Sequence, residues 1–171
     1  FDPNQFATGM SSEDYRNLTT NPENPLFNRA VVGVYPPGST IKPMLALAAL
    51  ETGATNLTRK TMCRGYFSLP NTTHRYRDWK PEGHGSVDLL DAISQSCDVY
   101  FYEIANDIGI NNMHRYLDQF GLGERTGVDL PRESRGLVPS TAWKRERFAG
   151  REPSERRWYD GETVIASIGQ G

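Results

Sequence analysis

The chain has 171 residues, of which 37% are hydrophobic, 11% aromatic and 23% charged, a balance that predicts one globular domain with a real core. Its formal net charge of −2 gives no electrostatic footprint for nucleic acid, and its apolar runs are too short to span a bilayer. No signal peptide is recognisable. Because the chain starts at Phe1 and closes on the turn residues 168–171, we expect it to be a piece of a longer protein.

The first third of the chain changes from polar turns to a buried helix. Residues 1–30 are polar and rich in turn residues, with one short helix expected from Ser12 to Leu18. A short β-prone run follows at 31–35. Residues 44–50 are apolar and rich in strong helix formers, and a glycine follows shortly after, so a buried helix is expected there.

Ser39 and Lys42 lie three residues apart at the start of this helix, after a rigid Pro-Pro-Gly approach. Residues at this spacing share one helix face, so the amine is within reach of the hydroxyl. Burial and the positive helix N-terminus both disfavour a charged ammonium, and a neutral amine is a base that can activate a serine. The pattern therefore indicates a serine nucleophile. The alternative is a helix-capping serine beside a solvent-reaching lysine.

The middle of the chain is expected to hold a short strand or turn at 66–70 and a half-buried strand at 71–79. Two helices are expected to follow, at 88–93 and 99–108. The polar segment 94–98, Ser-Gln-Ser-Cys-Asp, separates these helices. Taken alone, this segment is most simply a helix break with a capping serine, because Ser, Cys and Asp favour junctions.

The last third is expected to begin with an amphipathic helix at 111–120 and a short strand at 128–130. Residues 144–160 mix six basic residues with acidic ones, which is typical of a solvated, mobile loop. The β-prone run 163–168 predicts a further strand.

Two cysteines, Cys63 and Cys97, flank Asp78 and His84 along the chain. Two thiolates, an imidazole and a carboxylate can complete a closed tetrahedral zinc site. The alternatives are a disulfide in an oxidising compartment, two unrelated buried thiols, and an Asp78 that pairs with a neighbouring arginine. The spacing is not that of a standard zinc ribbon, so the residue types alone leave these alternatives open.

The segments 37–43 and 96–98 together resemble the first two active-site motifs of the penicillin-binding transpeptidases, S-x-x-K and S-D-N. Other segments resemble the monofunctional class of this family, namely 1–4, 28–30, 120–123 with 126–131, and 169–171. The segments 76–79 and 83–85 resemble the elongation branch of that class, the penicillin-binding protein 2 group. The resemblance implies the α/β (α+β) fold of penicillin-binding proteins and serine β-lactamases. Residues 1–171 would be a partial transpeptidase domain, mainly its helical lobe plus the nucleophile helix.

The same resemblance implies a peptidoglycan D,D-transpeptidase that cross-links stem peptides for cell elongation and shape. Ser39 would attack the D-Ala-D-Ala carbonyl to form an acyl-enzyme, Lys42 would take its proton, and Ser96 would relay that proton. Asp98 would bind substrate. Most relatives have asparagine at its position, and an ionised aspartate accepts hydrogen bonds but cannot donate them.

In the elongation branch the matching positions can hold a metal, so the resemblance favours structural zinc at Cys63, Asp78, His84 and Cys97. It implies no organic cofactor. The implied ligands are stem peptides and β-lactam antibiotics, and the implied partner is a membrane glycosyltransferase. The location would be the periplasmic face of the bacterial inner membrane, with the anchor outside this chain.

The third motif of the family, Lys-Thr/Ser-Gly on a strand, is not found in the chain. We therefore expect a transpeptidase domain truncated at both ends, which alone would be inactive. The alternatives are a serine β-lactamase, which would also deacylate, a non-catalytic β-lactam sensor domain, and a zinc-stapled scaffold.

Overall fold

The computed structural model describes all residues from 1 to 171 and divides them into two compact units. The first unit contains Phe1–Tyr35 and Gly127–Ser134, and the second contains Pro36–Thr126 and Arg135–Gly171. None of the helices combines the length and the hydropathy needed to cross a bilayer.

The first unit holds two short helices, α1 (Asn4–Thr8) and α2 (Ser12–Thr20). The expected helix is confirmed, and it begins behind Ser11, whose Oγ accepts a hydrogen bond from the Asp14 N–H at 3.0 Å. The β-prone runs 31–35 and 128–130 form no strands, so both strand predictions are wrong. The Val31 oxygen accepts a hydrogen bond from Ser134 N–H at 2.9 Å, but no strand ladder forms at either run, and β propensity without continued pairing and packing does not produce a strand.

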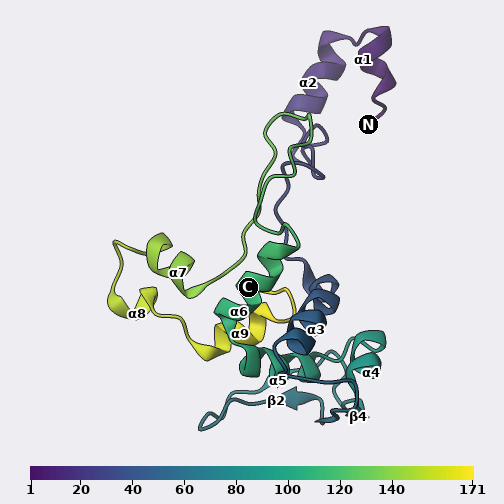
Figure 1. The fold of residues 1–171 in the computed structure, drawn as a ribbon. Helices are drawn as coiled ribbons and strands as arrows, with labels where there is room; N and C mark the ends of the chain where they lie inside the picture. Colours follow the sequence, from purple (N-terminus) through teal and green to yellow (C-terminus); the bar gives the residue numbers. More distant parts are fainter. The chain divides into compact units, whose positions relative to one another are not determined.

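The second unit is built around α5 (Asp98–Ile108), which packs against α3, α6 and α9 (Figure 1). Tyr100, Phe101 and Ile104 of α5 are fully buried in this core. The predicted helices of the apolar run, of the segments around 94–98 and of the amphipathic stretch are confirmed. The other helices of the unit are η1 (Gly38–Ile41), α3 (Lys42–Glu51), α4 (Leu89–Ser94), α6 (Ile110–Gln119), α7 (Thr141–Arg147), α8 (Pro153–Arg156) and α9 (Asp160–Ala166).

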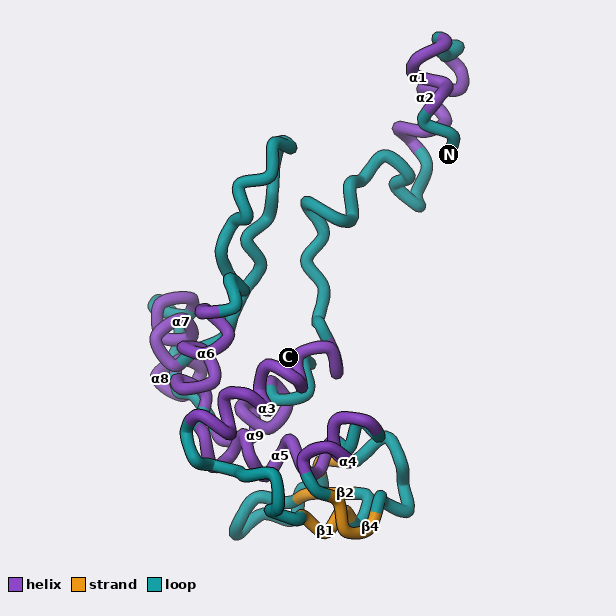
Figure 2. The backbone as a smooth tube through the Cα atoms, turned by 45° about the vertical axis from the view of Figure 1, so that its right-hand side comes forward, coloured by secondary structure: helices purple, strands orange, loops and turns teal.

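Four short strands gather beside α4 and α5 (Figure 2). They form two antiparallel pairs, β1 (Thr61–Cys63) with β4 (Gly85–Val87), and β2 (Tyr66–Phe67) with β3 (Tyr76–Arg77). Gly65 and Gly83 let the connecting loops touch, because a Cβ on Gly65 would lie 2.0 Å from the Pro81 oxygen and one on Gly83 would lie 2.2 Å from the Cys63 oxygen. The strand expected at 71–79 is reduced to two residues.

The strand expected at 163–168 is wrong, because α9 takes its place. The solvated loop expected at 144–160 is correct only in part: the segment is largely exposed, but it contains the end of α7 and all of α8. The helices α7 and α9 are stabilised by contacts between residues far apart or at helix ends, which amino-acid composition cannot predict. Lys144 is buried in an ion pair with Glu162, and Tyr159 N–H donates to Glu162 Oε2 at 2.8 Å at the start of α9.

Candidate active site

Ser39 is an exposed residue in the tight turn η1, directly before α3. The turn is tied to the loop after α9, because Gly38 N–H donates to the Gly169 oxygen at 3.0 Å. A Cβ on Gly169 would lie 2.3 Å from the Gly38 oxygen, and Gly169 has a φ of +67°. Only glycine allows both this conformation and this approach. The end of α9 thus fixes the turn that carries Ser39.

Lys42 opens α3 and is 1% exposed. Its Nζ donates to Ser96 Oγ at 3.1 Å, to the Ser96 carbonyl oxygen at 2.9 Å and to Asp98 Oδ1 at 2.6 Å. The Phe101 ring lies 5.3 Å from Nζ. The buried amine of α3 is therefore held by the junction between α4 and α5.

Ser96 lies in that junction, and the helix break predicted at 94–98 is confirmed. Its Oγ donates to Ser39 Oγ at 3.0 Å. The three hydroxyl and amine groups therefore form one path, from Ser39 through Ser96 to Lys42. The structure thus brings together the three residues that the sequence assigns to catalysis. It links Ser39 to Lys42 by way of Ser96.

Asp98 begins α5 and is buried beside Lys42. Its Oδ1 accepts from Lys42, its Oδ2 accepts from the Trp79 N–H at 3.0 Å, and its own N–H donates to Asp78 Oδ2 at 2.8 Å. Both carboxylate oxygens thus have protein partners. The predicted contact between Asp98 and substrate stays a prediction.

Cys63, Asp78, His84 and Cys97 meet in one cluster, with one ligand atom of each within 4.8 Å of the others. They come from the end of β1, the residue after β3, the loop before β4, and the residue before α5. Cys63 Sγ lies 3.5 Å from both Asp78 Oδ2 and His84 Nδ1, and Cys97 Sγ lies 3.5 Å from Asp78 Oδ2. Both cysteines are free thiols.

Three pairs of ligand atoms in this cluster have the spacing of a tetrahedral zinc site, and all four ligand atoms lie within 4.8 Å of one another. Metal–ligand bonds of 2.0–2.3 Å at tetrahedral angles place neighbouring ligand atoms about 3.5 Å apart. Burial raises the pKa of the Cys97 thiol, and a bound cation would reverse that preference by favouring the thiolate. His84 Nδ1 faces the cluster, while its buried Nε2 has no hydrogen-bond partner.

Asp78 is held in its ionised form although it is buried. Burial alone would raise the pKa of this carboxyl, but the backbone N–H groups of Lys80 and Val99, together with the neighbouring His84, bring it below its usual value. Its Oδ2 also accepts from the Asp98 N–H, so one carboxylate joins the metal-ligand cluster to the start of α5. The alternative pairing of Asp78 with a neighbouring arginine is not what the structure shows, because its contacts are to the cluster and to backbone N–H groups.

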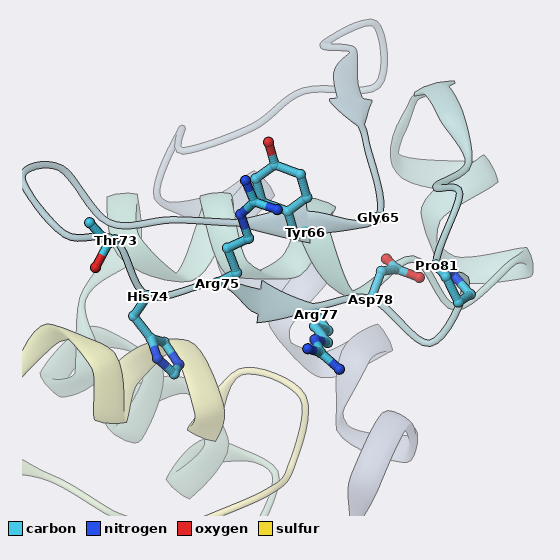
Figure 3. Close-up of a pocket in the computed structure, with 8 residues that line it drawn as sticks. All are labelled: Gly65, Tyr66, Thr73, His74, Arg75, Arg77, Asp78 and Pro81. Carbon is cyan, nitrogen blue, oxygen red and sulfur yellow. The ribbon is translucent and has the colours of Figure 1, made fainter.

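An open hollow of about 850 Å³ lies along the β2–β3 hairpin, with Asp78 at its edge (Figure 3). The Arg75 guanidinium stacks on the Tyr66 ring there, 4.3 Å from its centroid. Ser39, Lys42 and Ser96 do not line this hollow, so it is separate from the candidate active site. Its lining residues are Gly65, Tyr66, Thr73, His74, Arg75, Arg77, Asp78 and Pro81.

The role of Gly169 in fixing the turn that carries Ser39 was not predicted from the sequence. The residue lies in a Gly-Gln-Gly segment that resembles the family, but its contact with Gly38 joins parts of the chain more than a hundred residues apart. A glycine in a segment of turn residues indicates a turn, but it does not indicate which distant residue that turn contacts.

Comparison with known proteins shows the family to which this fold belongs. The family model described as the penicillin binding protein transpeptidase domain matches residues 1–171, so the chain belongs to that family. The predicted resemblance and fold class are confirmed.

Within the family, the chain is similar to enzymes named peptidoglycan D,D-transpeptidase MrdA. It is 49% identical to the Acinetobacter baumannii protein and 42% identical to the Escherichia coli K12 protein, each over 171 residues. The whole chain is matched in both cases, and it spans 25% and 26% of the lengths of these relatives.

Solved structures of two PBP2 proteins are also similar. Pseudomonas aeruginosa PBP2, in complex with WCK 5153, is 43% identical with a TM-score of 0.88, covering 100% of this chain and 36% of its own. Helicobacter pylori PBP2, in complex with MreC, is 38% identical with a TM-score of 0.85, covering 95% of this chain and 29% of its own.

Proposed function

We propose that this chain is part of the catalytic domain of a peptidoglycan D,D-transpeptidase that acts in cell elongation. One observation carries the proposal, the hydrogen-bonded path from Ser39 Oγ through Ser96 Oγ to Lys42 Nζ. Family membership supports the reaction type, and the relatives named peptidoglycan D,D-transpeptidase support the substrate, a peptidoglycan stem peptide ending in D-Ala-D-Ala.

The contacts of Lys42, three donated hydrogen bonds and an ion pair with Asp98, are those of an ammonium, and the same geometry suits a proton acceptor once the amine is neutral. A neutral amine has two N–H bonds and one lone pair. If the two N–H bonds point at Asp98 Oδ1 and the Ser96 carbonyl oxygen, the lone pair faces the Ser96 hydroxyl. The hydroxyl proton of Ser39 can then pass to Ser96 Oγ while the Ser96 proton passes to Lys42.

The reaction takes place in two acyl-transfer steps. Ser39 Oγ attacks the carbonyl carbon of the penultimate D-Ala, and its proton moves along the path to Lys42. The amide bond then breaks, the proton passes to the leaving amine, and D-alanine departs from an acyl-serine ester. An amine of a second stem peptide attacks this ester and loses a proton to the same path. The Ser39 hydroxyl is restored and the cross-link is released.

The oxyanion formed in each step needs two donors. We propose that the backbone N–H of Ser39 supplies one of them. We propose that the other comes from a Lys-Thr/Ser-Gly strand later in the polypeptide, so that residues 1–171 form a partial domain that is inactive alone. The share of the MrdA relatives that this chain spans, about a quarter, supports this organisation.

We also propose that Cys63, Asp78, His84 and Cys97 hold a structural zinc ion. The ion would supply four bonds that clamp β1 and the loops around Asp78 and His84 to the start of α5. All four positions would be protein ligands, so no site is left for a catalytic water. The atoms separated by about 3.5 Å in the cluster support this assignment.

The proposed function places the protein at the periplasmic face of the bacterial inner membrane, with the anchor in another part of the polypeptide. Helicobacter pylori PBP2 has been solved in complex with MreC, and another similar structure is a peptidoglycan synthase complex that coordinates polymerization and crosslinking. These complexes support an assembly of the elongation machinery with a membrane glycosyltransferase as a partner.

The test is the reaction of the full-length protein with a β-lactam, a mimic of D-Ala-D-Ala. Intact mass should rise by one drug molecule in the wild type and stay unchanged in Ser39→Ala. A stable adduct supports the transpeptidase, whereas rapid release of hydrolysed drug would indicate a β-lactamase. A stable adduct in a protein that fails to cross-link stem peptides would indicate a sensor domain. An adduct on Ser39→Ala would refute the assignment of the nucleophile.

A further inference from the structure

Trp79 is an exposed tryptophan whose indole N–H is nevertheless hydrogen-bonded to the protein backbone. The residue is 62% exposed, so it is not part of the core. Its indole Nε1 nevertheless donates to two backbone carbonyl oxygens, those of Gln95 and Ser96, at 3.1 Å each. Its backbone N–H donates to Asp98 Oδ2 at 3.0 Å. Trp79 therefore contacts two residues of the junction between α4 and α5, Gln95 and Ser96, and the first residue of α5, Asp98.

This junction contains a conformation that needs support. Ser96 has a φ of +54°, in the left-handed region that residues with a side chain rarely adopt. The conformation aims Ser96 Oγ at Ser39 Oγ and at Lys42 Nζ, 3.0 Å and 3.1 Å away. An unfavourable backbone conformation persists only where neighbouring groups fix it, and such residues cluster at functional sites.

Two donors fix the carbonyl group of Ser96. Lys42 Nζ lies 2.9 Å from the oxygen and Trp79 Nε1 lies 3.1 Å from it, so both lone pairs are used. In the proposed reaction Lys42 gains and loses a proton. The indole N–H does not take part in proton transfer, so it is the donor that stays constant through the cycle. The Trp79 ring is in turn held edge-on against His84, with 5.3 Å between ring centroids.

We propose that Trp79 is a positioning residue of the active site, whose indole N–H holds Ser96 in the conformation that connects Ser39 to Lys42. This inference rests on the proposed function, because positioning matters only if Ser96 relays a proton. It assigns Trp79 a role that is absent from the S-x-x-K and S-D-N motifs, in which Trp79 does not occur.

The kinetic test compares Trp79→Phe with wild type in the full-length protein. Phenylalanine keeps an aromatic ring and removes the N–H donor. Acylation by a fluorescent penicillin is resolved into a binding constant and a first-order acylation rate. Losing one neutral hydrogen bond should lower the acylation rate by roughly three- to tenfold and leave the binding constant unchanged. The matched control is Trp143→Phe, whose ring packs on Phe148, and it should react like wild type.

Three results would overturn the proposal. An unchanged acylation rate in Trp79→Phe would show that the indole N–H does not position Ser96. A weaker binding constant at an unchanged rate would make Trp79 a ligand contact instead. A loss of bound metal in Trp79→Phe but not in the control variant would show that the substitution lowers the acylation rate by disturbing His84, and not by releasing Ser96. Equal metal content in variant and wild type is the expected result.

A spectroscopic measurement tests the same contact without catalysis. In the wild-type protein with ¹⁵N-labelled indoles, the Trp79 Nε1–H should exchange with solvent at least tenfold more slowly than a free indole, although the ring is exposed. Exchange at the rate of a free indole would overturn the proposal even if Trp79→Phe failed to fold. A wild type that is not acylated would refute the proposed function instead, so the two failures are distinguishable.

Discussion

Replacing Gly169 with alanine tests how the nucleophile is held. Gly169 has a φ of +67°, and an added Cβ would lie 2.3 Å from the oxygen and 2.6 Å from the nitrogen of Gly38. The neighbouring atoms are backbone, so they cannot rotate away. The turn that carries Ser39 must move, and the hydrogen bond between Gly38 N–H and the Gly169 oxygen must lengthen or break.

The cost of this change follows from its two parts. The left-handed conformation costs alanine about 1–2 kcal/mol, and the lost hydrogen bond costs about 1 kcal/mol. A displacement of the Ser39 turn worth about 2–3 kcal/mol corresponds to a fall in acylation rate of roughly 30- to 150-fold.

The assay is the rate of labelling of the full-length protein by a fluorescent penicillin. The matched control is Gly150→Ala, because Gly150 has no atom within 4 Å of an added Cβ and no positive φ. This control should react like wild type. A Gly169→Ala protein that is labelled at the wild-type rate would refute the claim that the loop after α9 positions Ser39.

Two further predictions concern the second motif and the metal-ligand cluster. Ser96→Ala removes the hydroxyl between Ser39 and Lys42, so the acylation rate should fall about 10²- to 10⁴-fold. The control, Ser94→Ala, changes an exposed serine beside the same junction and should be labelled at the wild-type rate. A normal rate for Ser96→Ala would exclude the relay. His84→Ala removes one of the four proposed ligands, so elemental analysis should find no bound zinc and the protein should melt at a lower temperature. The control, His74→Ala, changes an exposed histidine and should keep its metal. Metal-free wild-type protein would contradict the zinc assignment.

The parts of the fold that could be predicted are those with a strong local signal. The helices α5 and α6 carry apolar residues at helical spacing, and α3 is an unbroken apolar run of strong helix formers, so the local sequence alone indicated all three. The run 163–168 contains β-branched residues that favour strands, yet it forms most of α9 because the contact between Tyr159 and Glu162 fixes the helix start and Val164 packs into the core. Tertiary packing here overrides local propensity.

The candidate site could be predicted only in part for a similar reason. Ser39 and Lys42 are three residues apart, so one turn of helix brings them together. Ser96 is 57 residues from Ser39, and its place beside the nucleophile depends on the packing of α3 against α5. The family motif, and not the local pattern, indicated this pairing. The contacts of Asp98 with Lys42 and Trp79 depend on the same packing, so the sequence did not reveal them.

Peptide mapping after reaction with a β-lactam tests the central claim most directly. Trypsin cuts after Arg29 and Arg59 and does not cut between Lys42 and Pro43, so it releases the peptide 30–59, in which Ser39 is the only serine. We predict that wild-type protein carries the drug mass on this peptide and that Ser39→Ala carries none. An adduct on a different peptide, or no covalent adduct in the folded full-length protein, would contradict the assignment of Ser39 as the nucleophile.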